Sequence, residues 1–388
     1  MREITDCFDL RSNVHTPYYC FNTDIFAKQV DDLRNKLKGK ARICYSMKAN
    51  PWFVNSALEC CDYIEVCSSG ELNICQEADI PMGRISVGGV AKTVEECQKI
   101  INLSPHRISI ESKAQLEIFE CLASRLNRTI FILLRLSSGN QFGMTLEQIK
   151  DIYKNVEQYP HIFIKGIHYY PGTQKKSLKD ARTIIQTLVN ALEILPINEI
   201  QFGAGIGVPL YISQNNEDYD TYANYIFEGI SILAEQCEVT LECGRYLTYL
   251  AGSYVTSVLE IKNQYDRRFL IVDGGIHQLS YHGQVGGKPV PIIKKIPQSS
   301  TSEITYTICG SLCTVNDILA KDVILPEIHV GDKLMFLNVG AYSVTEARMM
   351  FLSRDLPTIV LKNSKETVIR RRSFPTYTLN TVQSKRKE

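Results

Sequence analysis

Long hydrophobic runs and a large net charge are both missing from this sequence. No apolar stretch approaches the ~20 residues that a membrane-spanning helix needs, and residues 1–6 lack the charged and then apolar profile of a signal peptide. Lys and Arg together number 43 and Asp and Glu 42, so the formal net charge is +1. This balance disfavours charge-driven binding to nucleic acid or to an anionic membrane. We therefore expect a cytoplasmic protein with neither of these partners.

Paired metal-binding cysteines are also missing, although the chain has 13 cysteines. No Cys-x-x-Cys pair occurs, and the adjacent Cys60 and Cys61 cannot easily direct both sulfur atoms to one ion. The odd number of cysteines and the length of 388 residues argue against the disulfide framework of a small secreted protein. We predict no metal site and mostly buried, free thiols.

The first part of the chain, up to about residue 245, alternates short apolar runs with amphipathic stretches. In one such stretch, apolar residues recur at helical spacing at positions 26, 30, 33 and 37. The alternation predicts βα units and a parallel sheet. About eight strand candidates occur, which is the number that a closed (β/α)8 barrel needs. They are residues 42–46, 63–66, 84–87, 107–110, 129–136, 162–169, 199–202 and 239–242.

The second part of the chain is rich in strand patterns separated by turn residues, at 254–261, 268–272, 304–308 and 333–339. We therefore predict an α/β protein: a (β/α)8 TIM barrel at 23–245 and an all-β barrel or sandwich domain made from 1–22 and 246–388. The basic segments 370–372 and 385–388 either bind an acidic partner or form a solvated face and tail, and we favour the second interpretation.

Unusual residues follow several of the strand candidates, where the active sites of (β/α)8 enzymes lie. Gly203, Gly205 and Gly207 would let backbone N–H groups approach an anion, although these glycines alone fit a tight βα turn as well. Arg245 follows the next strand candidate and offers a planar fork for phosphate oxygens. Together these residues predict a phosphate site.

Lys48 stands just past the first strand candidate of the barrel. Alone it fits a lysine that extends to solvent, but a partly desolvated lysine can also act as an amine nucleophile. A lysine, a phosphate site and a nearby carboxylate are the three requirements of pyridoxal 5′-phosphate. With Glu242 as the carboxylate, the sequence predicts this cofactor.

The combined motifs resemble the fold-type III, alanine-racemase-like pyridoxal-phosphate enzymes, and among them the ornithine and diaminopimelate decarboxylases. The resemblance extends from residue 16 to residue 342. It rests on Tyr-Ser-Met-Lys-Ala-Asn at 45–50, Glu-Val-Cys-Ser-Ser-Gly-Glu-Leu at 65–72, Gln-Phe-Gly at 141–143, the glycine loop at 203–207, Glu-Cys-Gly-Arg-Tyr at 242–246 and Cys-Gly-Ser-Leu-Cys-Thr-Val-Asn-Asp at 309–317.

This resemblance implies roles for individual residues. Lys48 would form a Schiff base with the cofactor, and Glu242 would pair with its pyridinium nitrogen. Cys313 would reach the site from the partner subunit and return a proton to Cα after carbon dioxide leaves, so a homodimer with shared sites is expected. The other implied cofactor contacts are Tyr170, Thr173, Gly203, Ala204, Gly205, Gly244, Arg245 and Tyr342. The implied substrate contacts are Glu65, Arg135, His277, Thr314 and Asp317.

The sequence departs from these enzymes at two positions. Tyr170 stands where a histidine stacks on the cofactor ring; tyrosine can stack but cannot carry the imidazole charge. Thr314 stands where an acidic residue holds the distal amine of the substrate, and a hydroxyl cannot pair with an ammonium group. We interpret His168, two residues before Tyr170, as structural. Because the neutral Thr314 cannot pair with a distal ammonium group, a free diamino acid is disfavoured as substrate.

Other motifs resemble the butirosin and siderophore branch of these decarboxylases, namely Tyr-Pro-Gly-Thr-Gln at 170–174, Gly-Val-Pro at 207–209 and Asp-Gly-Gly-Ile-His at 273–277. Members of that branch act on an amino-acid unit attached to a carrier protein or a citrate conjugate. We expect such a substrate here, selected by a loop that contains His277, Gln278, His282 and Gln284, although these residues fit an ordinary polar loop equally well.

Three alternatives stay open at this point. The first is a decarboxylase of free diaminopimelate, ornithine or lysine. The second is an amino-acid racemase, which Glu242 disfavours because alanine racemases have an arginine beside the ring nitrogen, whereas a carboxylate favours the protonated ring that decarboxylation needs. The third is a non-catalytic cofactor-binding relative, which would not need the proton donor Cys313.

Overall fold

Two compact units make up the chain in the computed structural model, which describes residues 14–297 and 302–382. The barrel unit comprises Ala27–Val208 and Asn215–Leu247. The sheet unit comprises the described parts of Met1–Phe26 and Thr248–Glu388 together with Pro209–Gln214. The predicted boundaries at 22/23 and 245/246 lie within four residues of these divisions, whereas the assignment of Pro209–Gln214 to the sheet unit was not predicted. Residues 1–13 and the basic tail at 385–388 lie outside the described residues.

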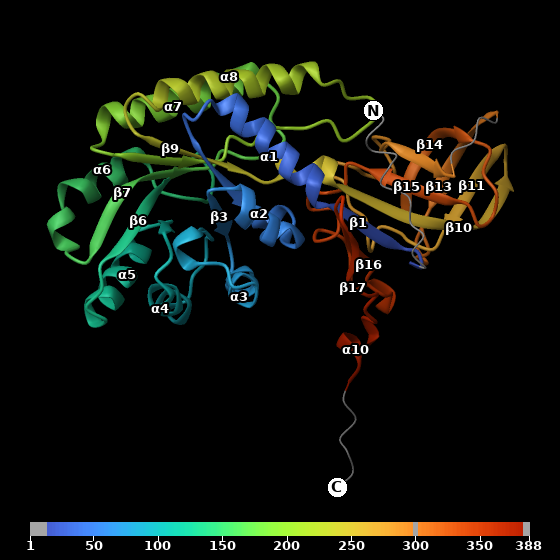
Figure 1. The fold of residues 1–388 in the computed structure, drawn as a ribbon, viewed down its shortest axis with the longest axis horizontal. Coiled ribbons are helices and arrows are strands. Elements are labelled where there is room, and N and C mark those ends of the chain that lie inside the picture. The colour runs from blue at the N-terminus through green and yellow to red at the C-terminus, as the bar shows by residue number, and fades with distance from the viewer. Residues whose placement is uncertain (1–13, 298–301, 383–388) are drawn as a thin grey trace, which may run out of the picture. The chain divides into compact units, whose positions relative to one another are not determined.

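Eight parallel strands close into a barrel in the order of the chain (Figure 1). This finding confirms the predicted (β/α)8 fold. The strands are β2 (Arg42–Ser46), β3 (Tyr63–Val66), β4 (Ile85–Val87), β5 (Arg107–Ile110), β6 (Ile130–Leu136), β7 (Ile162–Tyr169), β8 (Glu199–Phe202) and β9 (Glu238–Cys243). Because parallel neighbours run in one direction, the carboxyl ends of all eight strands lie at the same end of the barrel.

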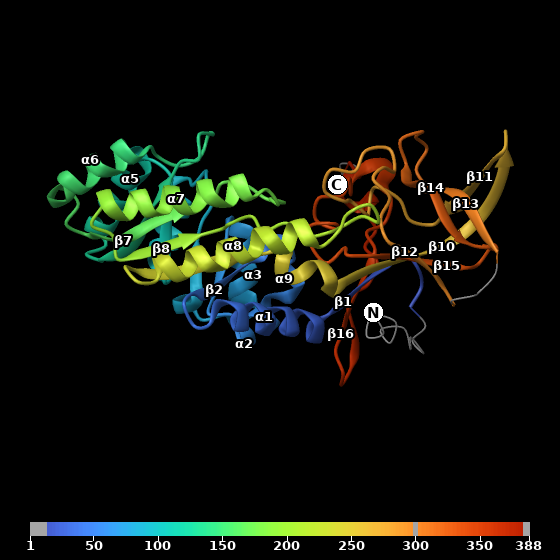
Figure 2. The ribbon, with the colours of Figure 1, turned by 90° about the horizontal axis from the view of Figure 1, so that it is seen from above.

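Helices follow the barrel strands and bury their apolar faces against them. In α1 (Thr23–Leu37), the residues predicted to share a face are all buried, from Phe26 at 0% exposure to Leu37 at 3%. Helices α7 and α8 lie side by side in both views (Figures 1 and 2). The other helices of the barrel are α2 (Val54–Cys60), α3 (Ser69–Glu77), α4 (Val94–Leu103), α5 (Lys113–Arg125) and α6 (Leu146–Lys154), with α7 at Leu178–Ile194, α8 at Glu217–Leu233 and the short α9 at Arg245–Thr248.

Side-chain caps determine where several of these helices begin. Ser68, Ser112 and Ser177 each accept a hydrogen bond from a backbone N–H of the first turn. Thr93 and Thr145 form capping boxes with Glu96 and Gln148. Each cap satisfies N–H groups that a helix start leaves without a partner, and it lies between a barrel strand and the helix that follows.

The sheet unit is built on one mixed sheet, which confirms the predicted β-rich second domain. Its main path runs β14-β13-β11-β10-β1-β16-β17, and β15 pairs with both β10 and β12. The strands are β1 (Tyr18–Asn22), β10 (Gly252–Gln264), β11 (Arg267–Val272), β12 (Ile293–Ile296), β13 (Glu303–Cys309), β14 (Ile318–Pro326), β15 (Lys333–Leu337), β16 (Thr358–Lys362) and β17 (Thr367–Arg371); a short helix, α10, follows at Tyr377–Asn380.

A small apolar core covers the centre of this sheet. Tyr18 and Cys20 of β1 pack with Val255 of β10, Met335 and Leu337 of β15 and Val360 of β16. β1 pairs antiparallel with β10 and parallel with β16, so a segment from the start of the chain joins strands that come more than 200 residues later.

In the described part of the chain, no helix is both long and apolar enough to cross a bilayer. Nor do three or more His, Cys, Asp or Glu side chains gather within residues 14–297 and 302–382 in a group that could hold a metal ion. The described cysteines are free, and six of them are buried: Cys20, Cys44, Cys61, Cys75, Cys97 and Cys243.

Candidate active site

Lys48 lies in a single helical turn directly after β2, and its amine contacts a carboxylate of the next strand. The Nζ atom is 2.7 Å from Oε2 and 3.0 Å from Oε1 of Glu65 on β3. Glu65 is 3% exposed, whereas the Lys48 side chain is 31% exposed. A buried carboxylate therefore holds an amine that solvent can still reach.

Cys67 is a third member of this group, which sequence reasoning did not single out. Its thiol donates a hydrogen bond to Glu65 Oε1 at 3.1 Å, and its Sγ atom is 3.4 Å from Lys48 Nζ. Burial raises the pKa of the Cys67 thiol well above its usual value, and the charge of Glu65 raises it further. The thiol therefore stays protonated at neutral pH and acts as a donor. Its spacing of two residues from Glu65 is the only sign of this contact in the sequence.

Glu242, on β9, is a buried carboxylate with partners on β7 and β8. His168 of β7 places Nε2 3.2 Å from Glu242 Oε1, and the amide of Gln201 on β8 donates to the same oxygen. Burial by itself would raise the pKa of Glu242, but attraction to His168 and Lys48 and hydrogen bonds from His168 and Gln201 outweigh it and lower this pKa to about 2. Glu242 is thus held as a carboxylate.

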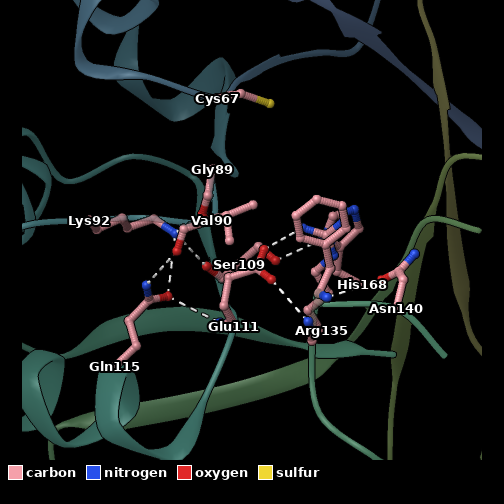
Figure 3. A network of polar contacts seen from close by, with 12 residues as sticks. Cys67, Gly89, Val90, Lys92, Ser109, Glu111, Gln115, Arg135, Asn140 and His168 are labelled. Carbon is pink, nitrogen blue, oxygen red and sulfur yellow. Dashed lines mark hydrogen bonds and ion pairs between the residues drawn. The ribbon is translucent and has the colours of Figure 1, made fainter. Parts of the chain in front are cut away.

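His168 is itself held from the other side of its ring. Its Nδ1 atom is 2.8 Å from Ser109 Oγ of β5 (Figure 3). His168 therefore connects Ser109 to Glu242.

Arg135, on β6, forms a buried ion pair with Glu111, which directly follows β5 (Figure 3). The second carboxylate oxygen of Glu111 accepts a hydrogen bond from Gly143 N at 3.0 Å. The centre of the Phe142 ring lies 4.8 Å from the guanidinium carbon of Arg135. The predicted substrate contact Arg135 therefore carries a charge that Glu111 already balances. Glu111 was not predicted, because it precedes its partner by 24 residues.

A second lysine, Lys92, forms hydrogen bonds at the carboxyl ends of the barrel strands. Lys92 donates hydrogen bonds to the carbonyls of Gly89 and Ser109 and to Gln115 Oε1 (Figure 3). Gln115 Oε1 also accepts from the backbone N–H of Glu111 at 3.0 Å. Burial lowers the pKa of Lys92 to about 8. Lys92 thus ties the ends of β4 and β5 to the segment that carries Glu111.

The glycine loop after β8 packs closely on the segment that follows β7. A Cβ atom at Gly203 would come within 2.6 Å of the Tyr170 ring and 3.3 Å of Glu242 Oε2. Gly205 has a φ of +62°, and a Cβ there would lie 2.1 Å from the carbonyl oxygen of Gly172. Side chains are therefore excluded at both positions.

Backbone donors of this loop are available for an anion. The N–H groups of Gly203 and Gly207 donate to the carbonyls of Tyr169 and Lys175. Among residues 14–297 and 302–382, no group accepts a hydrogen bond from the N–H of Ala204, Gly205 or Ile206. Successive N–H groups of this kind form the concave donor set that phosphate prefers.

Tyr170 lies between the amine and the glycine loop. Lys48 Nζ is 5.4 Å from the centre of its ring, and burial raises the pKa of its hydroxyl. The other predicted cofactor contacts of the barrel unit lie at the same strand ends. Thr173 is exposed in the segment packed on Gly205, Gly244 follows β9 and packs on Ala49, and Arg245, 6% exposed, begins α9.

The remaining predicted site residues belong to the sheet unit. Cys313 is exposed at the tip of the loop 310–317. Asp317 is buried in the same loop, and its two carboxylate oxygens accept hydrogen bonds from the N–H groups of Ile276 and Leu312, each at 2.8 Å. This carboxylate therefore binds the loop 310–317 to the segment around residue 276. Tyr342 is half-buried, with a φ of +65°.

In the loop that was predicted to select the substrate, His277 and Gln278 are buried within the sheet unit, whereas His282 is exposed and Gln284 is half-buried. His277 is 1% exposed, and burial lowers the pKa of its imidazole to about 4, with a further contribution from Arg354. Gln278 accepts a hydrogen bond from the Tyr254 hydroxyl and donates to the Asp355 carbonyl, each at 2.7 Å. Gln278 therefore holds strands and turns together within this unit.

Comparison with known proteins decides the family. A family model described as a pyridoxal-dependent decarboxylase, C-terminal sheet domain, matches residues 19–340. The chain belongs to the pyridoxal-dependent decarboxylase family. This decarboxylase is accordingly a carboxy-lyase that uses pyridoxal phosphate, which confirms the predicted enzyme class and cofactor.

Relatives of this decarboxylase include enzymes with different substrates. It is 28% identical to the L-glutamyl-BtrI acyl-carrier protein decarboxylase of Niallia circulans, over 94% of this chain and 92% of that one. It is 26% identical to a Staphylococcus aureus decarboxylase named for an (L-alanin-3-ylcarbamoyl)methyl derivative of 2-hydroxybutanedioate, over 90% and 95%. It is 25% identical to the diaminopimelate decarboxylase of Campylobacter jejuni, over 95% and 96%.

The same fold is found in solved structures. The diaminopimelate decarboxylase of Helicobacter pylori, complexed with L-lysine, superposes with a TM-score of 0.82 at 23% identity, over 95% of this chain and 96% of that one.

The residues of the barrel unit fit the cofactor. Pyridoxal phosphate needs an amine, donors for its phosphate and a charged partner for its ring nitrogen. Lys48, the N–H groups of the glycine loop and Glu242 supply these three features from β2, β8 and β9. The close approach of Gly203 to both Tyr170 and Glu242 leaves no side chain between the loop and the carboxylate.

Proposed function

We propose that this decarboxylase removes the α-carboxylate of an L-amino-acid unit that is joined to a larger group, either a carrier protein or a hydroxy-dicarboxylate. One observation carries the proposal. Asp317 is the only acidic residue in the loop 310–317, and both of its oxygens already accept backbone hydrogen bonds. The loop beside Cys313 therefore offers no free carboxylate to the distal ammonium group of a diamino acid.

Thr314 supports the same substrate class. It follows Cys313, and its hydroxyl accepts a hydrogen bond from Asn316 N at 3.3 Å. A neutral side chain engaged in its own turn suits a substrate whose distal amine is already bonded in an amide. The name of one relative describes such a substrate, an alanine unit linked through a carbamoyl group. The name of another describes a glutamyl group on a carrier protein, and a glutamyl group has no distal amine to be held.

A second candidate function is decarboxylation of a free diamino acid. It is favoured by the diaminopimelate decarboxylases among the relatives, which are 25–27% identical to this chain and so about as similar as the enzymes of conjugates. In that case an acidic residue outside the loop 310–317 would hold the distal amine.

Roles of the barrel residues follow from their contacts. Bound pyridoxal phosphate supplies an aldehyde for amines and an electron-accepting ring. Lys48 would hold the cofactor covalently, while Glu65 and the Cys67 thiol would hold the amine in place and Glu65 would accept or return its proton. Glu242, kept ionised, would retain a proton on the ring nitrogen, which strengthens the ring as an electron acceptor.

The phosphate would be held by the N–H groups of Ala204, Gly205 and Ile206 and by the guanidinium of Arg245, with Thr173 and Tyr342 as further donors. The Tyr170 ring would pack against one face of the cofactor ring. Tyrosine carries no charge there, so the proton on the ring nitrogen would depend on Glu242 alone.

Cys313 would return the proton to Cα across the interface of a homodimer. Its exposure within its own chain suits a residue that completes the site of a partner subunit. Acid catalysis of this kind contributes about 10²–10⁴-fold to a rate.

Replacing Cys313 by alanine should lower kcat by on the order of 10²-fold and leave cofactor binding unchanged, because the thiol donates a proton and does not bind the cofactor. Product formed in D2O should also lose stereochemical purity at Cα. The assay is carbon dioxide release with NMR of the deuterated product. Cys121→Ala, at another exposed cysteine, is the matched control. Unchanged rate and stereochemistry in C313A would remove Cys313 from the reaction.

Carbon dioxide release from a panel of substrates tests the proposed function. The panel contains free diaminopimelate, ornithine, lysine and glutamate, a glutamyl carrier protein and a citryl-diaminopropionate conjugate. We expect kcat/KM on one conjugate to exceed that on every free amino acid by at least about 100-fold, the scale on which a site rejects an unmatched polar group. Thr314→Asp should raise activity on a free diamino acid. If the wild type prefers a free diamino acid, the second candidate function is right.

A further inference from the structure

A series of hydrogen bonds between buried side chains leads from Glu242 into the interior of the barrel. Gln201 on β8 and Arg107 on β5 are each 1% exposed. Arg107 donates to Gln201 Oε1 at 3.1 Å, and Gln201 donates through Nε2 to Glu242 Oε1. These hydrogen bonds therefore connect the Arg107 guanidinium to Glu242, the carboxylate predicted to face the cofactor.

The orientation of the Gln201 amide follows from its partners. A guanidinium can only donate hydrogen bonds, so the oxygen of the amide must face Arg107. The amide nitrogen must then face Glu242, and a donor there favours the carboxylate form of Glu242 over the protonated acid. Ser86 Oγ lies 3.1 Å from Gln201 Oε1 and 3.0 Å from Nε2, and fits either end because a hydroxyl both donates and accepts.

Arg107 is held in place by four further contacts, one of them between its Nη2 atom and His106 Nε2 at 2.6 Å. It forms an ion pair with Glu199 of β8, donates to Thr240 Oγ1 at 3.3 Å and lies over the Tyr63 ring, with 4.6 Å from the guanidinium carbon to the ring centre. Glu199 balances its charge. The guanidinium cannot turn away from Gln201 without breaking these contacts, so the direction of the amide is determined by the barrel interior.

We propose that Gln201, oriented by Arg107, is a positioning residue that keeps Glu242 ionised and so retains the proton on the ring nitrogen of pyridoxal phosphate. The inference rests on Glu242 facing that nitrogen, as proposed above, and not on the identity of the substrate. His168 and Gln201 both contact Oε1 of Glu242. Without the Gln201 donor, Glu242 would be a stronger base, and the proton shared with the ring nitrogen would shift toward the carboxylate.

The test is ¹⁵N NMR of the holoenzyme loaded with pyridoxal phosphate labelled at the ring nitrogen, because this chemical shift reports the proton directly. Gln201→Leu removes the donor, and the nearly isosteric Gln201→Glu replaces it with a charge that repels Glu242. Thr240→Val is the matched control, since it removes another hydrogen bond of Arg107 without touching Glu242. Glu242→Gln is the reference for a lost carboxylate.

We expect both Gln201 variants to move the ¹⁵N signal toward that of a neutral pyridine and to lower kcat by on the order of tenfold, which corresponds to one pKa unit. T240V should give the wild-type signal. If E242Q moves the signal and neither Gln201 variant does, Gln201 has no such role. If E242Q also leaves the signal unchanged, Glu242 does not face the ring nitrogen, and the proposed placement of the cofactor falls as well.

Discussion

Replacing Lys48 by alanine should abolish covalent attachment of pyridoxal phosphate and lower carbon dioxide release by on the order of 10⁴–10⁶-fold, as expected for loss of a covalent catalyst. Lys48 is the amine that Glu65 holds at 2.7 Å beside the Tyr170 ring. The visible absorption band of the bound cofactor should disappear, and the K48A protein should keep its fold because the Lys48 side chain is 31% exposed and leaves no buried cavity.

Lys113→Ala is the control for this substitution. Lys113 begins α5 in the same barrel and pairs with Asp151 at the surface, with 55% of its side chain exposed. Its replacement should change neither the absorption band nor the rate. Wild-type turnover with an intact visible band in K48A would show that another amine carries the cofactor.

Replacing Glu242 by glutamine should lower kcat by on the order of 10²–10³-fold, the usual effect of removing one preorganised electrostatic group from an active site. The pKa of about 2 means that Glu242 is ionised throughout the neutral range. Glutamine keeps the shape of the side chain but cannot favour a protonated ring nitrogen. The measurement is steady-state carbon dioxide release at several pH values, with cofactor occupancy determined from absorbance.

Glu242→Asp separates charge from position in this experiment. It keeps the carboxylate but moves it away from His168 and Gln201, so its rate should lie between those of the wild type and E242Q. A glutamine variant with wild-type kcat across the pH range would mean that the ring nitrogen needs no carboxylate and that Glu242 does not strengthen the ring as an electron acceptor.

The barrel strands could be predicted because each is a short apolar run covered on both faces. Five of the eight, including β2 and β7, have the predicted limits, and the others differ by one residue at one or both ends. The sheet unit was harder to predict, since its edge strands bury little. None of the five residues of β17 is buried, and β12 has only Ile293 buried. Strands of this kind have no hydrophobic alternation to reveal them.

The site could be predicted only in part, for a similar physical reason. Lys48 and Glu242 stand out because a charged residue directly after or within a buried strand is unusual. Their partners depend on strand register and side-chain direction, which a single sequence does not give. Only the three-dimensional structure shows that Glu111 pairs with Arg135. The same holds for Gln201, which lies between Arg107 and Glu242.

Identification of the lysine that carries the cofactor tests this account most directly. Borohydride reduction of the holoenzyme fixes the bond between the lysine and pyridoxal phosphate as a stable amine, and peptide mapping by mass spectrometry then locates it. Lys92 is the informative competitor, because it lies at the same end of the barrel with its pKa lowered to about 8. The account predicts the modification on the peptide that contains Lys48. A modification on Lys92, or on no lysine of the barrel, would contradict it.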